Sequence, residues 1–224
     1  MRLVNTKYDI EIKFEENLIY VLDIENSEVL VSFMQNLWMQ SNGERGDFIL
    51  SENEREFKIE KKIECIYNPF EIDINNKKII TKLYSDMEEV SKDELYEIES
   101  EVNTVIVKYL DCLSKKFDYP VDYRVDLDMK GLLKMYDFKL QYEEKDFTSK
   151  LFSYVKLMHR ICGIEVFVLY NIKSFIPQNI TEKFYKELLY EKIFIILIED
   201  HQSESNMYEK RCIIDKDLCI IDIN

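Results

Sequence analysis

Two segments near the C-terminal end of the chain are almost entirely apolar, and they limit the possible fold more than any other feature. Ile164 to Tyr170 reads IEVFVLY, and Ile193 to Ile198 reads IFIILI. Strands buried on both faces of a parallel sheet have this composition, whereas half-exposed strands alternate. Between them, a segment that begins at Pro177 carries apolar residues at helical spacing: Ile180, Phe184, Leu188 and Leu189. Strand, helix and strand in this order predict a parallel pair joined by a right-handed crossover.

The N-terminal third also has the pattern of a sheet with a helix. Residues 3–14 alternate between apolar and charged side chains, which predicts one half-exposed strand. Leu18 to Leu22 is a continuous apolar run, and Phe57 to Tyr67 reads as one or two further strands. Between these strands, apolar residues recur at helical spacing: Val29, Leu30, Phe33, Leu37 and Trp38. The two ends of the chain therefore predict one α/β domain.

The middle of the chain predicts helices instead. An apolar stripe runs from Asn75 to Val90, and Ser91 with Glu94 fits a capping box at the start of a long amphipathic helix that reaches Phe117. Shorter helices are expected at 127–135 and 146–161, the second ending at Gly163. We expect an α/β head formed by residues 1–74 and 162–224, with residues 75–161 inserted as a projecting helical leg domain.

Composition narrows the class of protein. Hydrophobic residues make up 46 % of the chain, as in globular proteins, while the 4 Gly and 3 Pro are few for an all-β fold. No apolar run approaches the roughly 18 residues of a membrane helix, and no signal peptide opens the chain. The 5 Cys are odd in number and form no CxxC pair, so we expect reduced thiols in a cytoplasmic protein. The net charge of −14 argues against nucleic-acid binding unless lysines gather on one surface.

Two places could carry enzyme chemistry. Glu199, Asp200 and His201 directly follow the strand at 193–198, and ligands bind at the carboxyl ends of parallel strands. No nucleophile motif accompanies them, so a solvated loop is the favoured interpretation. The segment from Asp23 to Ser27 stands where a phosphate-binding loop would stand. It has no glycine and no Lys-Ser pair, and its acids would repel phosphate.

Acids and lysines form two further candidate sites. Asp111, Asp118, Asp122, Asp126 and Asp128 surround Pro120 and carry the kind of oxygen ligand that calcium accepts, but the residues alone favour a solvated acidic loop. Lysines cluster around one strand, at a helix start and on one helical face; they are Lys58, Lys61 and Lys62, then Lys77 and Lys78, then Lys130 and Lys134. Each could be an ordinary surface lysine, and a shared face would be needed to bind DNA.

Three stretches resemble a known family. They are VLDIENSEVLVSF, Phe70 to Glu89 (FEIDINNKKIITKLYSDMEE) and Asp146 to Glu199, in which Asn171 and Glu199 follow the two apolar strands. In these stretches the chain is similar to the Csn-two family, the fourth protein of type II-A CRISPR loci. The resemblance covers nearly the whole sequence.

The resemblance implies a P-loop-ATPase-like head without a functional Walker A motif and an inserted helical leg. It implies a homotetrameric ring that binds double-stranded DNA ends through a lysine-lined channel, and calcium held by acids near the leg. Asp111, Asp118 and Asp126 fall at acidic family positions. Such proteins act with the Cas-one and Cas-two integrase and the type II effector nuclease in spacer acquisition, a part of antiviral defence.

We therefore expect a non-enzymatic, sequence-independent DNA-binding protein. Its expected DNA contacts are the seven lysines named above, and its expected calcium ligands are Asp111, Asp118, Asp122 and Asp126. Two alternatives stay open. One is a protein-interaction adaptor that touches DNA incidentally, and the other is a nucleotide or phosphoester enzyme that uses Glu199, Asp200 and His201.

Overall fold

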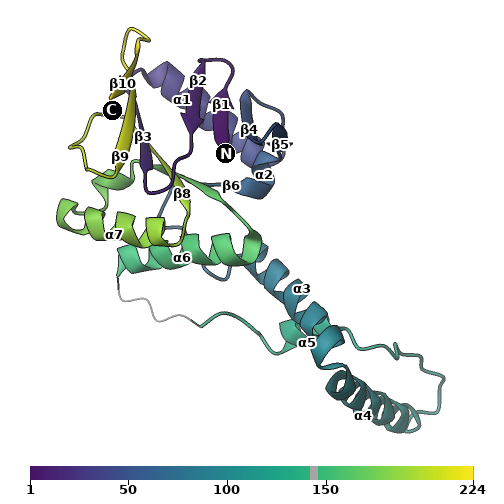
Figure 1. Ribbon diagram of the computed structural model, residues 1–224. Coiled ribbons are helices and arrows are strands. Elements are labelled where there is room, and N and C mark those ends of the chain that lie inside the picture. Colours follow the sequence, from purple (N-terminus) through teal and green to yellow (C-terminus); the bar gives the residue numbers. More distant parts are fainter. Residues whose placement is uncertain (142–145, 224) are drawn as a thin grey trace. The chain divides into compact units, whose positions relative to one another are not determined.

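The chain folds into two compact units in a computed structural model that describes residues 1–141 and 146–223 (Figure 1). The first unit contains Met1–Ile74 together with Glu143–Asn224, and the second contains Asn75–Tyr142. Helix α6 (Phe147–Cys162) belongs to the first unit, although we expected it in the inserted segment. Its Leu151, Val155 and Met158 are fully buried, so its apolar face belongs to a core.

The first unit is built around a six-stranded sheet in the order β10-β9-β3-β8-β7-β6. Every neighbouring pair from β9 to β6 is parallel, and β10 is antiparallel to β9. This arrangement confirms the mixed α/β class with a parallel-rich sheet. The strands are β3 (Ile19–Ile24), β6 (Ile63–Ile66), β7 (Val166–Tyr170), β8 (Phe194–Glu199), β9 (Glu209–Ile214) and β10 (Ile220–Ile223).

A second, antiparallel sheet has the order β2-β1-β4-β5, with β1 (Arg2–Asn5), β2 (Ile10–Lys13), β4 (Phe48–Glu52) and β5 (Arg55–Phe57). Residues 3–14, which alternation predicted as one strand, form the hairpin of β1 and β2. The chain reverses because the Asn5 side chain accepts hydrogen bonds from the backbone N–H groups of Lys7 and Tyr8, and Asp9 adopts a left-handed φ of 55°.

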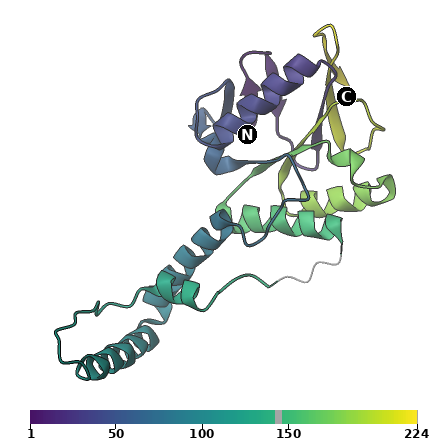
Figure 2. The same ribbon diagram turned by 180° about the vertical axis from the view of Figure 1, so that it is seen from behind.

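Helices cover both faces of the large sheet (Figures 1 and 2). Helix α1 (Ser27–Ser41) and the small sheet pack on one face, where Phe33 lies edge-on to Phe48. Helices α6 and α7 (Gln178–Tyr190) lie side by side on the other face. Both faces of β7 and β8 are therefore buried, which explains their continuous apolar sequences. The short helices α2 (Ile59–Lys62) and η1 (Ile172–Ser174) complete this unit.

The second unit is helical, with α3 (Lys77–Glu94), α4 (Tyr96–Ser114) and α5 (Met129–Met135). The predicted capping box at Ser91 is wrong, because α3 continues through Glu94 and α4 begins after Leu95. Ser91 is buried, and its hydroxyl donates to Glu99 at 2.7 Å instead of capping a helix. The predicted long helix is therefore shorter in the structure, where α4 begins at Tyr96 and ends at Ser114.

The two ends of the second unit are joined by one side chain. Asn75 donates from Nδ2 to the backbone oxygen of Leu140 at 3.1 Å, and its Oδ1 accepts from the Leu140 N–H at 2.9 Å. This reciprocal pair imitates the pairing of two strands. It fixes the points where the chain enters and leaves the helical unit next to each other.

Candidate functional site at the carboxyl ends of the parallel strands

The candidate site begins with two acids at the carboxyl ends of adjacent strands. Asp23 of β3 is the register partner of Glu199 of β8, and neither side chain is exposed to solvent. We expected Asp23 in a loop, but β3 continues to Ile24 and carries Asp23 into the interior. Buried acids are costly unless charged or hydrogen-bonding groups compensate them. The neighbouring residues supply that compensation.

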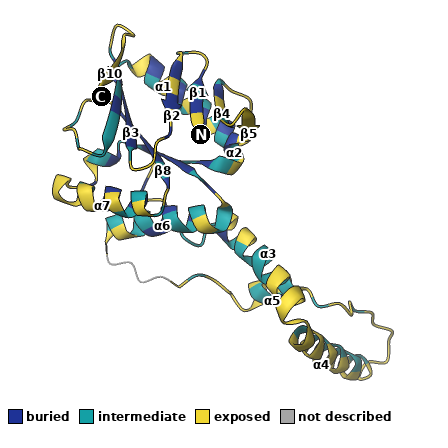
Figure 3. Cartoon of the chain, in the orientation of Figure 1, coloured by how far each residue is buried: buried dark blue, intermediate teal, exposed yellow. Residues whose placement is uncertain are grey.

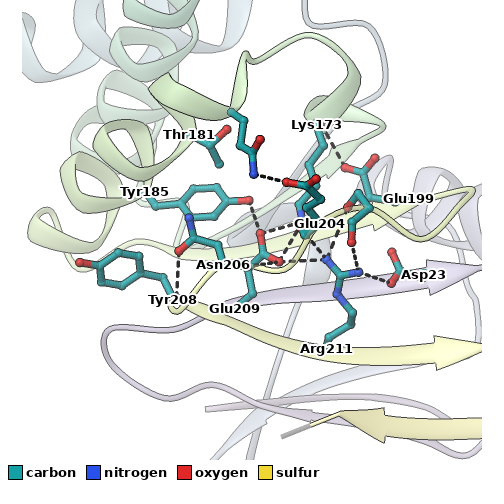
Figure 4. Close-up of polar contacts among 12 residues, drawn as sticks. Asp23, Lys173, Thr181, Tyr185, Glu199, Glu204, Asn206, Tyr208, Glu209 and Arg211 are labelled. Carbon is teal, nitrogen blue, oxygen red and sulfur yellow. Dashed lines mark hydrogen bonds and ion pairs between the residues drawn. The ribbon is translucent and has the colours of Figure 1, made fainter.

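Arg211 and Lys173 are the cations of this cluster (Figure 4). Nη1 of Arg211, on β9, lies 3.1 Å from Oδ2 of Asp23, and its Nη2 lies 3.0 Å from Glu209. Nζ of Lys173, from η1, lies 2.7 Å from Glu209, whose carboxylate also accepts the Tyr185 hydroxyl at 2.9 Å. Sequence reasoning missed these residues. The charged residues of EKRCII, beside an otherwise apolar strand, were the available signal.

Burial changes the protonation of the two acids. Desolvation raises the pKa of Glu199 to about 7, against the smaller opposing effect of the Lys173 N–H, which donates to Oε1 at 3.3 Å. Desolvation also raises the pKa of Asp23, and the Arg211 charge opposes this shift. Glu199 is therefore an acid that can hold a proton near neutral pH. The prediction that Glu199 occupies a solvated loop is wrong.

Asp200 and His201, the other members of the predicted catalytic address, are more accessible. Their side chains pair with each other, which raises the pKa of His201 and lowers the pKa of Asp200. Asn171 follows β7 with a left-handed φ of 47°, and its side chain accepts the Asp200 N–H at 3.1 Å. No nucleophilic Ser or Cys joins this pair in the hydrogen bonds of the described residues.

A small cavity of about 190 Å³ lies beside the cluster. Polar side chains make up most of its lining, which includes Lys173, Gln178, Thr181, Glu204 and Glu209. Glu204 already accepts a hydrogen bond from Gln178, and Lys173 is paired with Glu209. The charged groups here therefore satisfy one another within the chain.

The turn where a phosphate-binding loop would lie is short. Only Glu25 and Asn26 separate β3 from α1, and the Asn26 side chain caps the helix by accepting from the N–H groups of Glu28 and Val29. Phosphate binding needs free N–H groups and positive charge at such a helix start. Here the Asn26 side chain already accepts hydrogen bonds from two of these N–H groups, and the carboxylates of Glu25 and Glu28 add negative charge that repels phosphate.

The acids predicted to bind calcium are not brought together. Asp111 lies on α4 and pairs with Lys115 at 2.6 Å, whereas Asp118, Asp122 and Asp126 lie in the irregular segment between α4 and α5. Among the described residues, no group of three or more His, Cys, Asp or Glu side chains is placed to hold a metal ion.

The lysines predicted to bind DNA are divided between the units. The first unit contains Lys58, Lys61 and Lys62, and the second contains Lys77, Lys78, Lys130 and Lys134. Several are partly neutralised, since Lys62 pairs with Glu165, Lys58 with Glu60 at 3.8 Å and Lys130 with Glu88 at 3.1 Å. Lys61, Lys77 and Lys134 are exposed.

Many residues of helix α4 are exposed (Figure 3), and several of them are apolar. None of its residues is buried. Its exposed apolar residues recur at helical spacing, and they are Ile98, Val102, Val105, Tyr109 and Leu113. A contiguous exposed apolar surface of this kind marks an interaction site in soluble proteins.

The fold and the site define a mixed α/β protein with a parallel-rich sheet, a buried cluster of acids and cations that includes Asp23 and Glu199 at the strand ends, and a separate helical unit. Within this class, the chain belongs to the family described as CRISPR-associated protein (Cas_Csn2), whose model matches residues 40–218. The resemblance found in the sequence is thereby confirmed, and the chain has a CRISPR-associated role.

Other comparisons add little. No curated protein matches the chain significantly. A solved structure from Pyrococcus furiosus, assigned as an ABC-transporter ATP-binding protein, is similar at 13 % identity and a TM-score of 0.38. The similarity covers 91 % of this chain and 88 % of that one, but it is too weak to support an argument. Among the described helices, none is long and apolar enough to cross a membrane.

Proposed function

We propose that this chain is a non-enzymatic protein of CRISPR spacer acquisition that assembles into a homotetrameric ring and binds double-stranded DNA ends without sequence preference. Membership of the Cas_Csn2 family over residues 40–218 is the observation that carries the proposal. Its partners in this role are the Cas-one and Cas-two integrase and the type II effector nuclease. The site of action is the cytoplasm.

Assembly of several copies explains how a negatively charged chain can bind DNA. A chain with a net charge of −14 repels a duplex as a whole, so binding requires lysines from several copies to converge on one surface. Lysine contacts with phosphate release counterions, which gives salt-dependent binding without base readout. The exposed Lys61, Lys77 and Lys134 are the residues best suited to such contacts, because none of them forms an ion pair with an acid among the described residues.

The exposed face of α4 supports self-association. Val105 and Tyr109 are 66 % and 65 % exposed although both are apolar or aromatic. Burying such side chains against a second copy stabilises an oligomer by roughly 1.5–3 kcal/mol for each large side chain. Calcium bound by acids near the helical unit stays a prediction of the family resemblance.

The absence of a nucleotide-dependent step is also part of the proposal. The two-residue turn before α1 is capped by Asn26 and flanked by Glu25 and Glu28, which disfavours phosphate at the helix start. Addition of ATP with magnesium should leave the melting temperature unchanged. A concentration-dependent rise would show nucleotide binding and would revive the enzyme alternative.

Duplex binding tests the proposal directly. Purified protein should bind linear duplex at low salt and bind a closed circle of the same sequence weakly, since a ring must thread over an end. The double variant Lys61→Glu/Lys134→Glu should weaken binding about tenfold or more and reduce the salt dependence by about 0.9 per lost phosphate contact. Lys183→Glu, an exposed change on α7, is the matched control and should bind as wild type. Equal affinity for linear and circular DNA would contradict the ring.

One alternative function has an observation in its favour. In this alternative, the apolar face of α4 binds another protein and not a second copy of this chain, and the chain acts as an adaptor of the adaptation complex. A monomeric protein in solution that lacks duplex affinity at low salt, with or without calcium, would favour this alternative over the ring.

A further inference from the structure

The ionic cluster at the strand ends contains most of the unsatisfied buried polar atoms of the described residues. Five such atoms have no hydrogen-bond partner, and four belong to Asp23, Glu199 and Arg211: both carboxylate oxygens of Asp23, Oε2 of Glu199 and Nε of Arg211. Asp23 keeps its ion pair with Arg211, but the pair lacks hydrogen-bond geometry. A buried carboxylate oxygen without a donor costs about 1–3 kcal/mol, so this concentration requires a physical reason.

Counting charges supplies that reason. The cluster holds three carboxyl groups, Asp23, Glu199 and Glu209, against the two cations Arg211 and Lys173. With every group ionised, the buried cluster would carry one uncompensated negative charge. A proton on Glu199 removes that charge. Asp23 is the register partner of Glu199 on the adjacent strand, and its negative charge makes ionisation of Glu199 less favourable.

The same two cations hold the segment 200–208, which connects β8 to β9. Nη1 of Arg211 donates to the backbone oxygen of Ser203 at 2.6 Å, and its Nη2 donates to that of Glu204 at 3.3 Å. Nζ of Lys173 also donates to the Glu204 backbone oxygen, at 3.2 Å. The attachment of this segment therefore depends on how the cations divide their hydrogen bonds between its carbonyl groups and the buried acids.

We propose that Glu199 holds a proton next to Asp23, and that this proton latches the segment 200–208, which returns from the carboxyl end of β8 to the amino end of β9. With the proton in place, Arg211 and Lys173 hold the segment's carbonyl oxygens. Loss of the proton adds a buried negative charge that attracts both cations, so the segment opens more readily. This device does not depend on the proposed DNA binding.

The groups around Glu199 set the pH at which the latch responds. They come from every element packed against it, and they are Asp23 of β3, Tyr170 of β7, Lys173 of η1, Tyr185 of α7, Glu209 and Arg211 of β9, and Asp200 and His201 beyond β8. Folding raises the Glu199 pKa from an ordinary 4.5 to about 7. In this proposal, opening the segment admits water to Glu199 and relieves part of its burial, so the closed segment binds the proton more tightly than the open one and closure weakens as the pH rises toward 7.

Hydrogen exchange of the intact chain tests the latch. After correction for intrinsic rates, protection of residues 200–208 should fall by up to about tenfold per pH unit between pH 5 and 7 and then level off. Protection in β7 should change less. Glu199→Gln carries a permanent donor in place of the proton, so its segment should be equally protected at pH 5 and pH 8.

Two control variants separate the alternatives. Glu187→Gln on the exposed face of α7 should keep the wild-type pH dependence. His201→Gln should also keep it, since His201 is the other group that titrates nearby. Loss of the dependence in His201→Gln, its persistence in Glu199→Gln, or constant protection in the wild type would each overturn the proposal. Infrared spectroscopy provides a second measurement. The wild type should show the band of a protonated carboxyl group at pH 6, and Glu199→Gln should lack it. A wild type without this band would also overturn the proposal.

Discussion

Asp23 and Glu199 are partner residues on adjacent parallel strands, and both side chains are completely buried. A parallel register brings the carboxyl ends of β3 and β8 to the same edge, so two acids that are far apart in sequence become neighbours. The cations that compensate them come from a third strand and a short helix. The first unit therefore contains an ionic core at the edge where related α/β folds place ligands.

The stability of the protein should fall as the pH rises from about 4.5 to 7. The folded state binds a proton at Glu199 in this range that the unfolded state has released, so the free energy of unfolding decreases and then levels off above pH 7. A shift of this size corresponds to an upper limit of roughly 3 kcal/mol. Urea unfolding of wild type and Glu199→Gln at several pH values measures the effect. A wild-type profile that rises with pH over this range would contradict it.

Arg211 and Lys210 offer a matched pair of adjacent residues. Replacing Arg211 by Met leaves Asp23 and part of Glu209 buried without a cation, and we expect a loss of about 3–5 kcal/mol. Lys210 pairs with Glu15 at the surface, and Lys210→Met should change stability by less than about 1 kcal/mol. Chemical unfolding of both variants at one pH gives the comparison. Equal losses would show that Arg211 is not essential to the cluster.

The exposed face of α4 should control the oligomeric state. Val105→Glu places a charge on the apolar face and should lower the solution mass measured by light scattering. Thr104→Glu adds the same charge one residue away, where Glu101 and Lys108 form a polar face, and should leave the mass unchanged. Both positions are exposed, so the folded chain itself should tolerate either change within about 0.5 kcal/mol. Identical masses for all three proteins would exclude this face from the interface.

Gly163 ends α6 in a left-handed conformation with a φ of 69°. A Cβ at this position would meet no atom within 4 Å, so the cost of Gly163→Ala comes from the backbone alone. We expect a loss of about 1–2 kcal/mol in urea unfolding. Gly163→Asn should lose less, because Asn adopts this conformation more readily. A neutral Gly163→Ala would show that the helix end rearranges at little cost.

The sequence predicted the parallel core well because its signal is local and strong. The apolar runs at β7 and β8 have no charged residue between Val166 and Tyr170 or between Phe194 and Ile198, and full burial is the consequence. The hairpin of β1 and β2 was missed because alternation continues through its turn. The Ser91 cap was missed because α3 extends past it, where the second unit buries its hydroxyl.

The ionic cluster could be predicted only in part. Glu199 was recognised as a candidate from its place after an apolar strand, but its compensation by Lys173, Glu209 and Arg211 depends on strand order. Strand β9 follows β8 in the sequence but pairs with β3 on the side away from β8. No local sequence pattern predicts this strand order. The calcium ligands and DNA contacts stay predictions, because the proposed function places them in an assembly of several copies.

The reciprocal hydrogen bonds between Asn75 and Leu140 have a consequence for how such proteins diversify. Because they pin both ends of the helical unit at one point, lengthening or shortening the helices beyond that clasp need not disturb the sheet. Evolution can therefore change the length of the helices in the second unit while the strand order of the first unit stays constant.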